Sequence, residues 1–543
     1  ASAADWDFVG ITIAGAAAPI SGTRFGDAGD NSGITFDTPK TVYKNATGTT
    51  AITSLAWSNT SGGAGNNIYF PLPQDTAIFD NNSNATFAAS TNQLSGTLDF
   101  SARTTSLTFS VGASVEIYGN LIFGSGVTVS TTTTRLFFYG TANQTFTPNG
   151  IAITTGVTVG KTAGTLTLGG AVTQGATATL PFTVQNGAVS FGSYSHTFVQ
   201  LTATDSTFTQ TLTFGGGSIT IGTTNVAPVQ ISSGTTTASG SNTFYITNTG
   251  TITRTISSNA TGLRYSDYYV TGGTAGSVSF SGTVGKIDFS NGGAGTFTGS
   301  FANTIVSVYG DFKLKSGMSW TTQANTVTFQ GGAGTNNIDF AGITGGCPIA
   351  FNNTEGGGWV LQSAYATSNS TTYSSGSINL AGYSFTTSSL SFPSTGSFEF
   401  NGATVTLTAS GTVWSFAGTA TLTNSSGTAT VAMTSASTKT FAGNSNTYPV
   451  TLSQGGTGAL IVSGSNTFNN ITNTVVGTVQ FTAGTTTTFA TGFNLNGTST
   501  AARLTLGSTS TSQATLKKAT TWYMGAGSLD SGNNTNLTFT AGG

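Results

Sequence analysis

The sequence predicts an all-β protein, a parallel β-helix (β-solenoid) with roughly 20 residues per coil. Helical signals are nearly absent, because Gly, Thr, Ser and Asn dominate and no sustained helical spacing of apolar residues is found. Apolar and small polar residues alternate instead, as in Leu166-Thr167-Leu168. A short glycine motif also recurs at nearly constant intervals along the chain.

The motif is a glycine followed by an apolar residue at the second and fourth positions after it. It recurs at a nearly constant step, from Gly376 to Gly396, from Gly458 to Gly477 and from Gly164 to Gly187. The Asn446-Thr447-Tyr448 step also recurs as Asn466-Thr467-Phe468. Such intervals suit one coil, whose corners need the positive φ that Gly and Asn tolerate, while its apolar positions point inward. An antiparallel sandwich or several small β-domains remain the alternative, since both also have short strands and frequent turns.

The two ends differ from the middle. Eight of the 17 acidic residues and four of the ten prolines lie in the first hundred positions, whereas residues 400–502 hold one charged residue, Lys439. We therefore expect an N-terminal head and attachment region over 1–89, a β-solenoid rod over 90–515 and a short C-terminal cap over 516–543. Open ends of a β-helix expose unpaired strand edges, so each end should be capped or joined to a partner.

Composition excludes several classes of function. Charged residues make up 6% of the chain, where about a quarter is usual, so hydroxyl and amide groups must supply the polar surface. A net charge of -2 with 15 Lys and Arg argues against nucleic-acid binding. No apolar run approaches the roughly 18 residues of a membrane-spanning helix, so no membrane insertion is expected. The single cysteine, Cys347, excludes an intrachain disulfide and favours a buried core residue.

Catalytic chemistry is not expected, and neither is a cofactor or a metal. A glycosidase needs paired carboxylates, and the best pair in the predicted rod is Asp267 with Asp288, about one coil apart. His196 is the one histidine, and its neighbour Ser195 does not by itself make a catalytic dyad. The acidic turn over 27–33 lacks the alternating acids and final Glu of a calcium loop.

Aromatic side chains are the candidates for contact with a receptor or a sugar. Most Phe should stack inside the solenoid, but Tyr and Trp can expose a ring and still satisfy a polar group. Burial in the core is the alternative for each of them. The candidates are Tyr265, Tyr268 and Tyr269, which lie near Arg264, and Trp522 with Tyr523 in the tail.

Several stretches at the two ends carry a family resemblance. They span 23–36, 39–43, 56–58, 61–65, 71–80 and 522–535, with sequences such as Thr23-Arg-Phe-Gly-Asp and Trp522-Tyr-Met-Gly-Ala-Gly. These stretches resemble virion structural, fibre-like proteins of marine tailed phages that have Gly/Thr/Ser-rich β-solenoid repeats. The stretches 56–58, 61–65 and 71–80 are also similar to a module repeated in some large bacterial surface proteins. One departure is Lys44, which follows Tyr43 where the pattern has an aromatic residue. The resemblance implies a virion structural or fibre-like role and carries over no catalytic residue.

The expected function is therefore non-enzymatic: a bacteriophage tail fibre or capsid-attached fibre on the virion surface, acting as rigid spacer and host-contact surface. Its expected partners are other virion or filament subunits, through the head and the capped ends, and a host-surface glycan or protein. A homo-oligomer such as a trimer is compatible with the same coil period. The alternative is a bacterial cell-surface or extracellular filament-forming adhesin built on the same solenoid.

Overall fold

The computed structural model confirms an all-β chain that forms a parallel β-solenoid of about 19 turns with roughly 23 residues per coil. The chain divides into two compact units, Ala1–Thr283 and Val284–Gly543. The structure describes residues 4–16, 18–46, 56–89, 93–130, 134–175, 177–222, 227–231, 236–247, 254–260, 262–271, 277–291, 298–299, 306–320, 322, 324–499 and 501–518.

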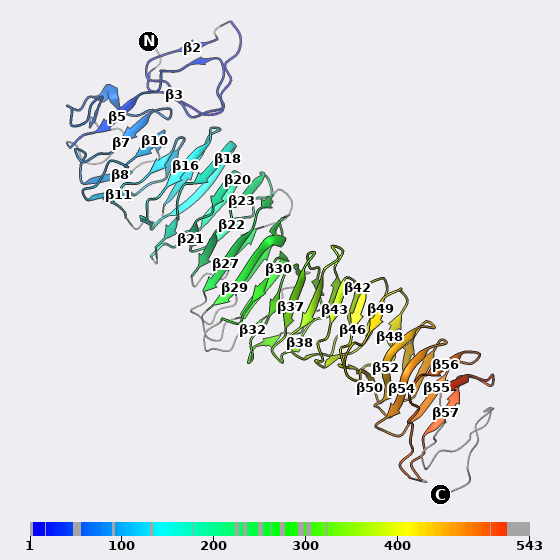
Figure 1. Ribbon diagram of the computed structural model, residues 1–543. Coiled ribbons are helices and arrows are strands. Elements are labelled where there is room, and N and C mark those ends of the chain that lie inside the picture. Colours follow the sequence, from blue (N-terminus) through cyan, green and yellow to red (C-terminus); the bar gives the residue numbers. More distant parts are fainter. Residues whose placement is uncertain are drawn as a thin grey trace. The chain divides into compact units, whose positions relative to one another are not determined.

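In the first unit each coil has three faces, and one long sheet supplies two of them. Strands β18 and β20 are long enough to run across both of these faces, so each pairs with two strands of a neighbouring coil (Figure 1). The strands of this sheet are β5 (Thr41–Lys44), β6 (Trp57–Ser58), β7 (Thr76–Ile78), β9 (Gln93–Ser95), β10 (Thr97–Asp99), β12 (Val115–Ile117), β13 (Leu121–Ile122), β15 (Arg135–Phe138), β16 (Gln144–Thr147), β18 (Gly156–Leu168), β20 (Phe182–Gly192), β22 (Leu201–Ala203), β23 (Gln210–Phe214), β25 (Val229–Ile231), β26 (Thr236–Ser239), β28 (Arg254–Ser258) and β30 (Ser277–Val284).

The third face of the first unit is built from two sheets in succession. The first sheet holds β8 (Thr86–Ala89), β11 (Leu107–Val111) and β14 (Val127–Val129). The strands that follow are β17 (Ala152–Ile153), β19 (Thr173–Gln174), β21 (Ser195–Phe198), β24 (Ser218–Ile221), β27 (Asn242–Thr247) and β29 (Ser266–Thr271). Two short 3-10 helices, η1 (Asn67–Tyr69) and η2 (Leu263–Tyr265), lie in connections.

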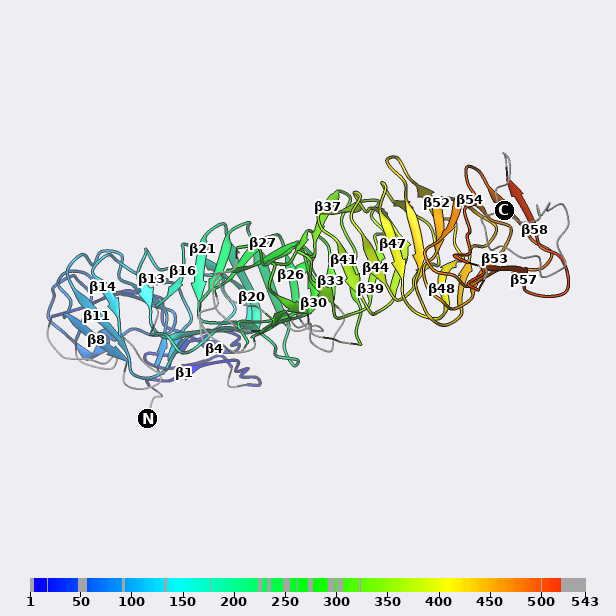
Figure 2. The same ribbon diagram turned by 90° about the horizontal axis from the view of Figure 1, so that it is seen from below.

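The second unit also has three faces. The strands of one face are β33 (Val306–Val308), β36 (Val327–Phe329), β39 (Ile349–Asn352), β42 (Thr371–Ser375), β45 (Leu390–Phe392), β48 (Gly411–Phe416), β51 (Lys439–Ala442), β53 (Leu460–Ser463), β55 (Thr478–Phe481) and β57 (Thr505–Ser508). Strands β32 (Thr298–Gly299) and β35 (Ser319–Trp320) belong to the same sheet but form a separate ladder with each other, while β33 pairs with β36. The next face holds β31 (Ile287–Asp288), β34 (Phe312–Lys313), β37 (Thr335–Asp339), β40 (Gly358–Leu361), β43 (Ser377–Asn379), β46 (Ser397–Glu399) and β49 (Thr421–Thr423). The last holds β38 (Thr344–Gly345), β41 (Tyr365–Thr367), β44 (Phe385–Thr387), β47 (Thr404–Leu407), β50 (Thr430–Met433), β52 (Thr447–Gln454), β54 (Thr467–Asn473), β56 (Thr486–Phe489) and β58 (Thr515–Lys518), and Figure 2 shows β41, β44 and β47 side by side.

The repeats found in the sequence are confirmed as strand register. Ile378 pairs with Phe398, Leu460 with Val479 and Leu166 with Val189, so each pair of glycine motifs occupies equivalent positions in consecutive coils. The coil is nevertheless longer on average than the motif intervals suggest. The step from Phe182 to its partner Leu201 is much shorter than the next step, from Leu201 to Val229. The coils differ in length because the connections between their strands differ in length, while the strands still pair in register.

Inward positions are apolar and stack from coil to coil. In the second unit Tyr365, Phe385 and Val405 are consecutive partners in one ladder, and all are buried. The rings of Tyr365 and Phe385 lie 5.1 Å apart. This stacking follows from the period-two pattern, because alternate side chains of a strand point to the same side.

Buried cations stabilise several corners by binding main-chain oxygens. The Lys161 ammonium donates to the carbonyls of Gly140 and Ala142 and to Gln144 Oε1, at 3.2, 2.8 and 2.8 Å. Lys439 donates in the same way to three carbonyls, and both side chains are fully buried. Each ammonium therefore satisfies carbonyls that the corner turns inward, away from water.

The N-terminal segment holds β1 (Asp7–Phe8), β2 (Ile20–Ser21), β3 (Gly26–Asp27) and β4 (Ile34–Thr35), paired in parallel as β1 with β3 and β2 with β4. The solenoid ladder begins inside the region expected to be the head. Strand β5 pairs with β7, and β7 pairs with β10, all in parallel. Paired coil strands are thus present from Thr41 onward, and the division into head, rod and cap stays a prediction.

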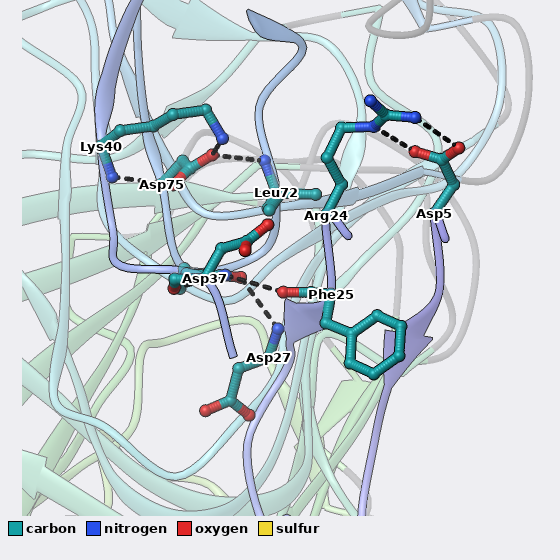
Figure 3. Close-up of polar contacts among 9 residues, drawn as sticks. Asp5, Arg24, Phe25, Asp27, Asp37, Lys40, Leu72 and Asp75 are labelled. Atoms are coloured by element: carbon teal, nitrogen blue, oxygen red, sulfur yellow. Dashed lines mark hydrogen bonds and ion pairs between the residues drawn. The ribbon is translucent and has the colours of Figure 1, made fainter. Parts of the chain in front are cut away.

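Two side chains tie this N-terminal segment to the first coil (Figure 3). Gln74 donates to the Phe25 carbonyl at 3.0 Å and accepts from the Asp27 amide at 2.8 Å. Asp75 accepts from the Lys40 amide and ammonium at 2.9 and 2.7 Å. The segment is thus fixed against the solenoid by partly buried polar contacts.

At the other end, β58 pairs in parallel with β56, so residues 515–518 belong to the ladder. The remainder of the expected cap, 519–543, lies outside the described residues. Within the described part of the chain, no helix has the length and hydropathy that crossing a bilayer requires.

Candidate functional site

The tyrosine cluster predicted for receptor contact is divided between core and surface. Tyr268 is 0% exposed, its ring stacks on Phe244 at 4.8 Å, and its hydroxyl lies 3.1 Å from Ser258 Oγ. Burial raises the pKa of this phenol well above its usual range. Tyr268 therefore lies in the core, the alternative stated for these aromatic residues, because this position of β29 points inward.

Tyr269 and Tyr265 do reach the surface. The Tyr269 ring stacks on exposed Tyr245 at 5.5 Å, one coil away in register. Tyr265 is 53% exposed, and the Arg264 guanidinium lies 4.8 Å from its ring centroid and donates to its hydroxyl at 2.6 Å. Tyr245 was missed in the sequence, although it precedes Tyr269 by close to one coil length. The other predicted pair, Trp522 and Tyr523, lies outside the described residues.

The residues considered for catalysis form hydrogen bonds within the core. His196 is buried; its Nδ1 accepts from the Val172 amide at 3.1 Å and its Nε2 lies 2.7 Å from the Phe191 carbonyl. Cys347 is also buried, and Trp320 Nε1 donates to its sulfur at 3.2 Å. These contacts indicate structural roles for both residues.

The acidic pair considered for a glycosidase is divided between the two units. Asp267 lies in the first unit and Asp288 in the second. The Asp288 carboxylate forms an ion pair with Lys286 at 3.1 Å and accepts from the Ser290 amide at 2.8 Å. These hydrogen bonds and the lysine lower the pKa of Asp288 against the opposing effect of burial, so the group is held as a carboxylate.

A groove of about 370 Å³ on the first unit brings together a different set of side chains. It follows the outward positions of β15, β18 and β20 and the corner after β22. Phe137, Thr158 and Thr183 are consecutive partners across these strands and form its floor. Arg135, Val184, Gln185, Thr204 and Asp205 complete the lining. The period-two pattern explains the floor, because the residues between these positions point into the core.

Arg135 is the cation of this groove. Its Nη1 lies 3.3 Å from the hydroxyl oxygens of Thr158 and Thr183 and 3.5 Å from the Pro181 carbonyl, which are long hydrogen bonds. Gly156 lies beneath the side chain: a Cβ at this position would be 3.1 Å from Arg135 Cγ. The glycine therefore lets the arginine lie flat along the outer surface of the coil.

In the part of the chain that the structure describes, no acidic side chain neutralises the charge of Arg135. Among the residues that the structure describes, no carboxylate lies within the 4.0 Å of an ion pair from its guanidinium. Burial lowers the pKa of Arg135, because the charged group is partly removed from water. Asp205 lines the same groove, and its carboxylate accepts a hydrogen bond from the Thr207 amide at 2.8 Å.

The groove therefore offers a guanidinium, an aromatic ring, three hydroxyls, an amide and a carboxylate within one hollow. Phe137 is half-buried and stacks on Tyr139 at 5.5 Å, which holds its ring in place. No group of three or more His, Cys, Asp or Glu suited to a metal occurs among the described residues. Comparisons of the chain with protein-family models, with curated proteins and with solved structures find no match.

Proposed function

We propose that this chain is a non-enzymatic structural protein of a bacteriophage appendage, a tail fibre or capsid-attached fibre exposed on the virion. The observation that carries the proposal is the stacking of coils in register within each unit. Each coil pairs its strands with the next and adds about 4.8 Å to the stack. Such a stack resists bending and presents equivalent outward positions at regular intervals, which suits a spacer with a contact surface.

The chemistry of the outer surface supports exposure to solvent without reliance on charge. Outward ladder positions are rich in hydroxyl and amide side chains, such as Thr197, Thr220 and Gln230. The cations Lys161 and Lys439 are buried and bind carbonyls instead of forming surface ion pairs. A surface of this kind is insensitive to salt, because little of its polarity depends on screened charges.

The N-terminal segment supports attachment through this end. It exposes three apolar side chains, Trp6 and Val9 at 51% and Ile11 at 42%. Large apolar side chains exposed in this way are available for contact with another protein. We propose that other subunits of the particle cover them. The assignment to a phage rests on the sequence resemblance of 23–80 and 522–535; a bacterial surface adhesin is the alternative outcome.

The experiment that tests this function separates particles from the culture that produces the chain on a density gradient. Quantitative mass spectrometry then follows the chain and the most abundant capsid protein through the fractions. We expect a constant ratio between the two across the particle peak and after a second gradient. Recovery of the chain with cell envelopes or free filaments, at a ratio that falls with each gradient, would contradict the phage assignment and favour the adhesin.

A further inference from the structure

We propose that the groove formed by Arg135, Phe137, Thr158, Thr183, Gln185 and Asp205 binds an acidic oligosaccharide through the carboxylate of one sugar unit. This inference names the ligand of the contact surface and rests on the proposed function in that respect. The binding chemistry itself belongs to the groove, so it can be tested on the purified chain.

The positive charge of Arg135 favours an anionic ligand in the groove. Arg135 meets only neutral oxygens in the described part of the chain, at 3.3 to 3.5 Å, and these contacts use Nη1 alone. A guanidinium presents five N–H donors in a planar fork that matches a carboxylate. A carboxylate entering the groove would supply both the missing counter-charge and two short hydrogen bonds.

The remaining lining suits the body of a sugar. The Phe137 ring can cover an apolar face of a pyranose, while Thr158 and Thr183 carry hydroxyls one coil apart on the groove floor. Gln185 and Asp205 add an amide and a carboxylate that can bind sugar hydroxyls at the rim. Because coils repeat at about 4.8 Å, an oligosaccharide lying along the stack meets one outward side chain per coil.

The size and shape of the groove agree with such a ligand. A volume of about 370 Å³ lies at the lower end of the range for small-molecule sites, and it accommodates one or two sugar units of a longer chain. Its lining spans β15, β18 and β20, three successive coils, so further sugar units can extend along the same face in either direction.

The test is isothermal titration calorimetry of the full chain with a tetramer of α-1,4-linked galacturonate. The fully methyl-esterified tetramer is the neutral control, because it keeps the sugar rings and removes the charge. We expect binding of the acid, weakened by salt, and at least tenfold weaker binding of the ester. A sulfated oligosaccharide of the same length distinguishes carboxylate recognition from general anion binding, and equal affinity for both anions would overturn the carboxylate assignment.

Variants locate the site. Arg135→Gln should weaken binding of the galacturonate tetramer by roughly tenfold or more. Lys517→Gln, which removes an exposed cation from β58, is the charge-matched control and should leave the affinity unchanged. Phe137→Thr should weaken the acid and the ester alike, whereas Asp205→Asn should not weaken the acid. Equal affinities of the Arg135→Gln and Lys517→Gln chains, or no binding by the unmodified chain, would overturn the inference and leave the particle assignment to the gradient experiment.

Discussion

Tyr448 and Phe468 occupy the same inward position in consecutive coils, and their rings stack with centroids 5.3 Å apart and an interplanar angle of 20°. Phe441, on a neighbouring face, packs against both rings at 4.9 and 5.1 Å. The Tyr448 hydroxyl donates to the Gly443 carbonyl at 2.5 Å, which satisfies the one polar atom of this group. The three rings show that the inward side chains of one coil of the second unit pack directly on those of the next coil.

Removing one of these rings should destabilise the second unit. Phe468→Ala is expected to lower the free energy of unfolding by about 3–5 kcal/mol, because it removes a fully buried ring and leaves a cavity between two coils. Urea unfolding followed by tryptophan fluorescence measures the change. Tyr383→Ala, in the same unit but 40% exposed, is the matched control and should change stability by less than about 0.5 kcal/mol. Equal effects of the two substitutions would contradict the inward ladder.

We expect the buried ammonium of Lys439 to stabilise the corner whose carbonyls it binds. Its three donors match the carbonyls of Ser435, Gly456 and Gly458 at 3.0, 3.1 and 2.7 Å. Lys439→Met keeps the aliphatic volume but removes the ammonium from the Ser435 and Gly456 carbonyls, while the Gly458 carbonyl keeps its hydrogen bond from Gln454 Nε2 at 2.7 Å. We therefore expect a loss of about 2–5 kcal/mol in urea unfolding. Lys517→Met on the exposed side of β58 makes the same chemical change at the surface and should be nearly neutral. A neutral Lys439→Met would show that water can replace the ammonium.

Acid should destabilise the first unit through His196. Burial lowers the pKa of this imidazole, because the protonated ring is poorly solvated and its Nδ1 must accept from the Val172 amide. The unfolded chain has a histidine pKa of about 6.5 and therefore binds the proton first. Stability is fully present above pH about 6.5 and falls as the pH is lowered below it.

Unfolding of the chain between pH 7 and pH 5 measures this effect. His196→Phe should lower stability at pH 7, because the Val172 amide loses its acceptor, but it should flatten the dependence on pH in this window. Carboxylates with lowered pKa, such as Asp288 and Glu399, contribute mainly at more acidic pH. An unchanged slope in the His196→Phe chain would assign the acid sensitivity to other groups.

Asp75 should hold the N-terminal segment against the first coil. Its side chain is 0% exposed and accepts from the Lys40 ammonium and from the Leu72 amide at 2.7 and 2.8 Å. Asp75→Ala leaves these donors unpaired, at an expected cost of about 2–4 kcal/mol, and should release residues 4–40 to proteolysis before the solenoid. Asp5→Ala removes the ion pair with Arg24, which lies at the surface, and should change the cleavage rate little. Equal rates for the two variants would contradict the role of Asp75.

The sequence predicts the fold because the signals for a solenoid are local. Alternation decides which residues face inward, and the recurrence of Gly376-Ser-Ile at Gly396-Ser-Phe already contains the strand register that the structure confirms. The mean coil length was underestimated, because the motif intervals sampled short coils and missed connections such as the one before Val229. Acids and prolines do not mark where the ladder begins, because they also occur beside the first coil strands, as Pro73 and Asp75 do before β7.

Functional positions were harder to predict, because they depend on which side of a strand faces out. Tyr268 points into the core and its neighbour Tyr269 points outward. Only the pairing of Tyr268 with Phe244 and of Tyr269 with Tyr245, one coil earlier, distinguishes the two positions. The groove combines Arg135 and Asp205, which are far apart in sequence and lie on different coils. No local pattern links two such residues until the stacking of the coils is known.

The central claim, a structural appendage on the outside of a phage particle, is tested most directly by immunogold cryo-electron microscopy. Antibody raised against the purified chain is applied to intact particles, and antibody absorbed with the same chain is the control. The account predicts gold on thin projections from the capsid or tail of most particles. Gold confined to cell-surface filaments, with particles unlabelled, would contradict it.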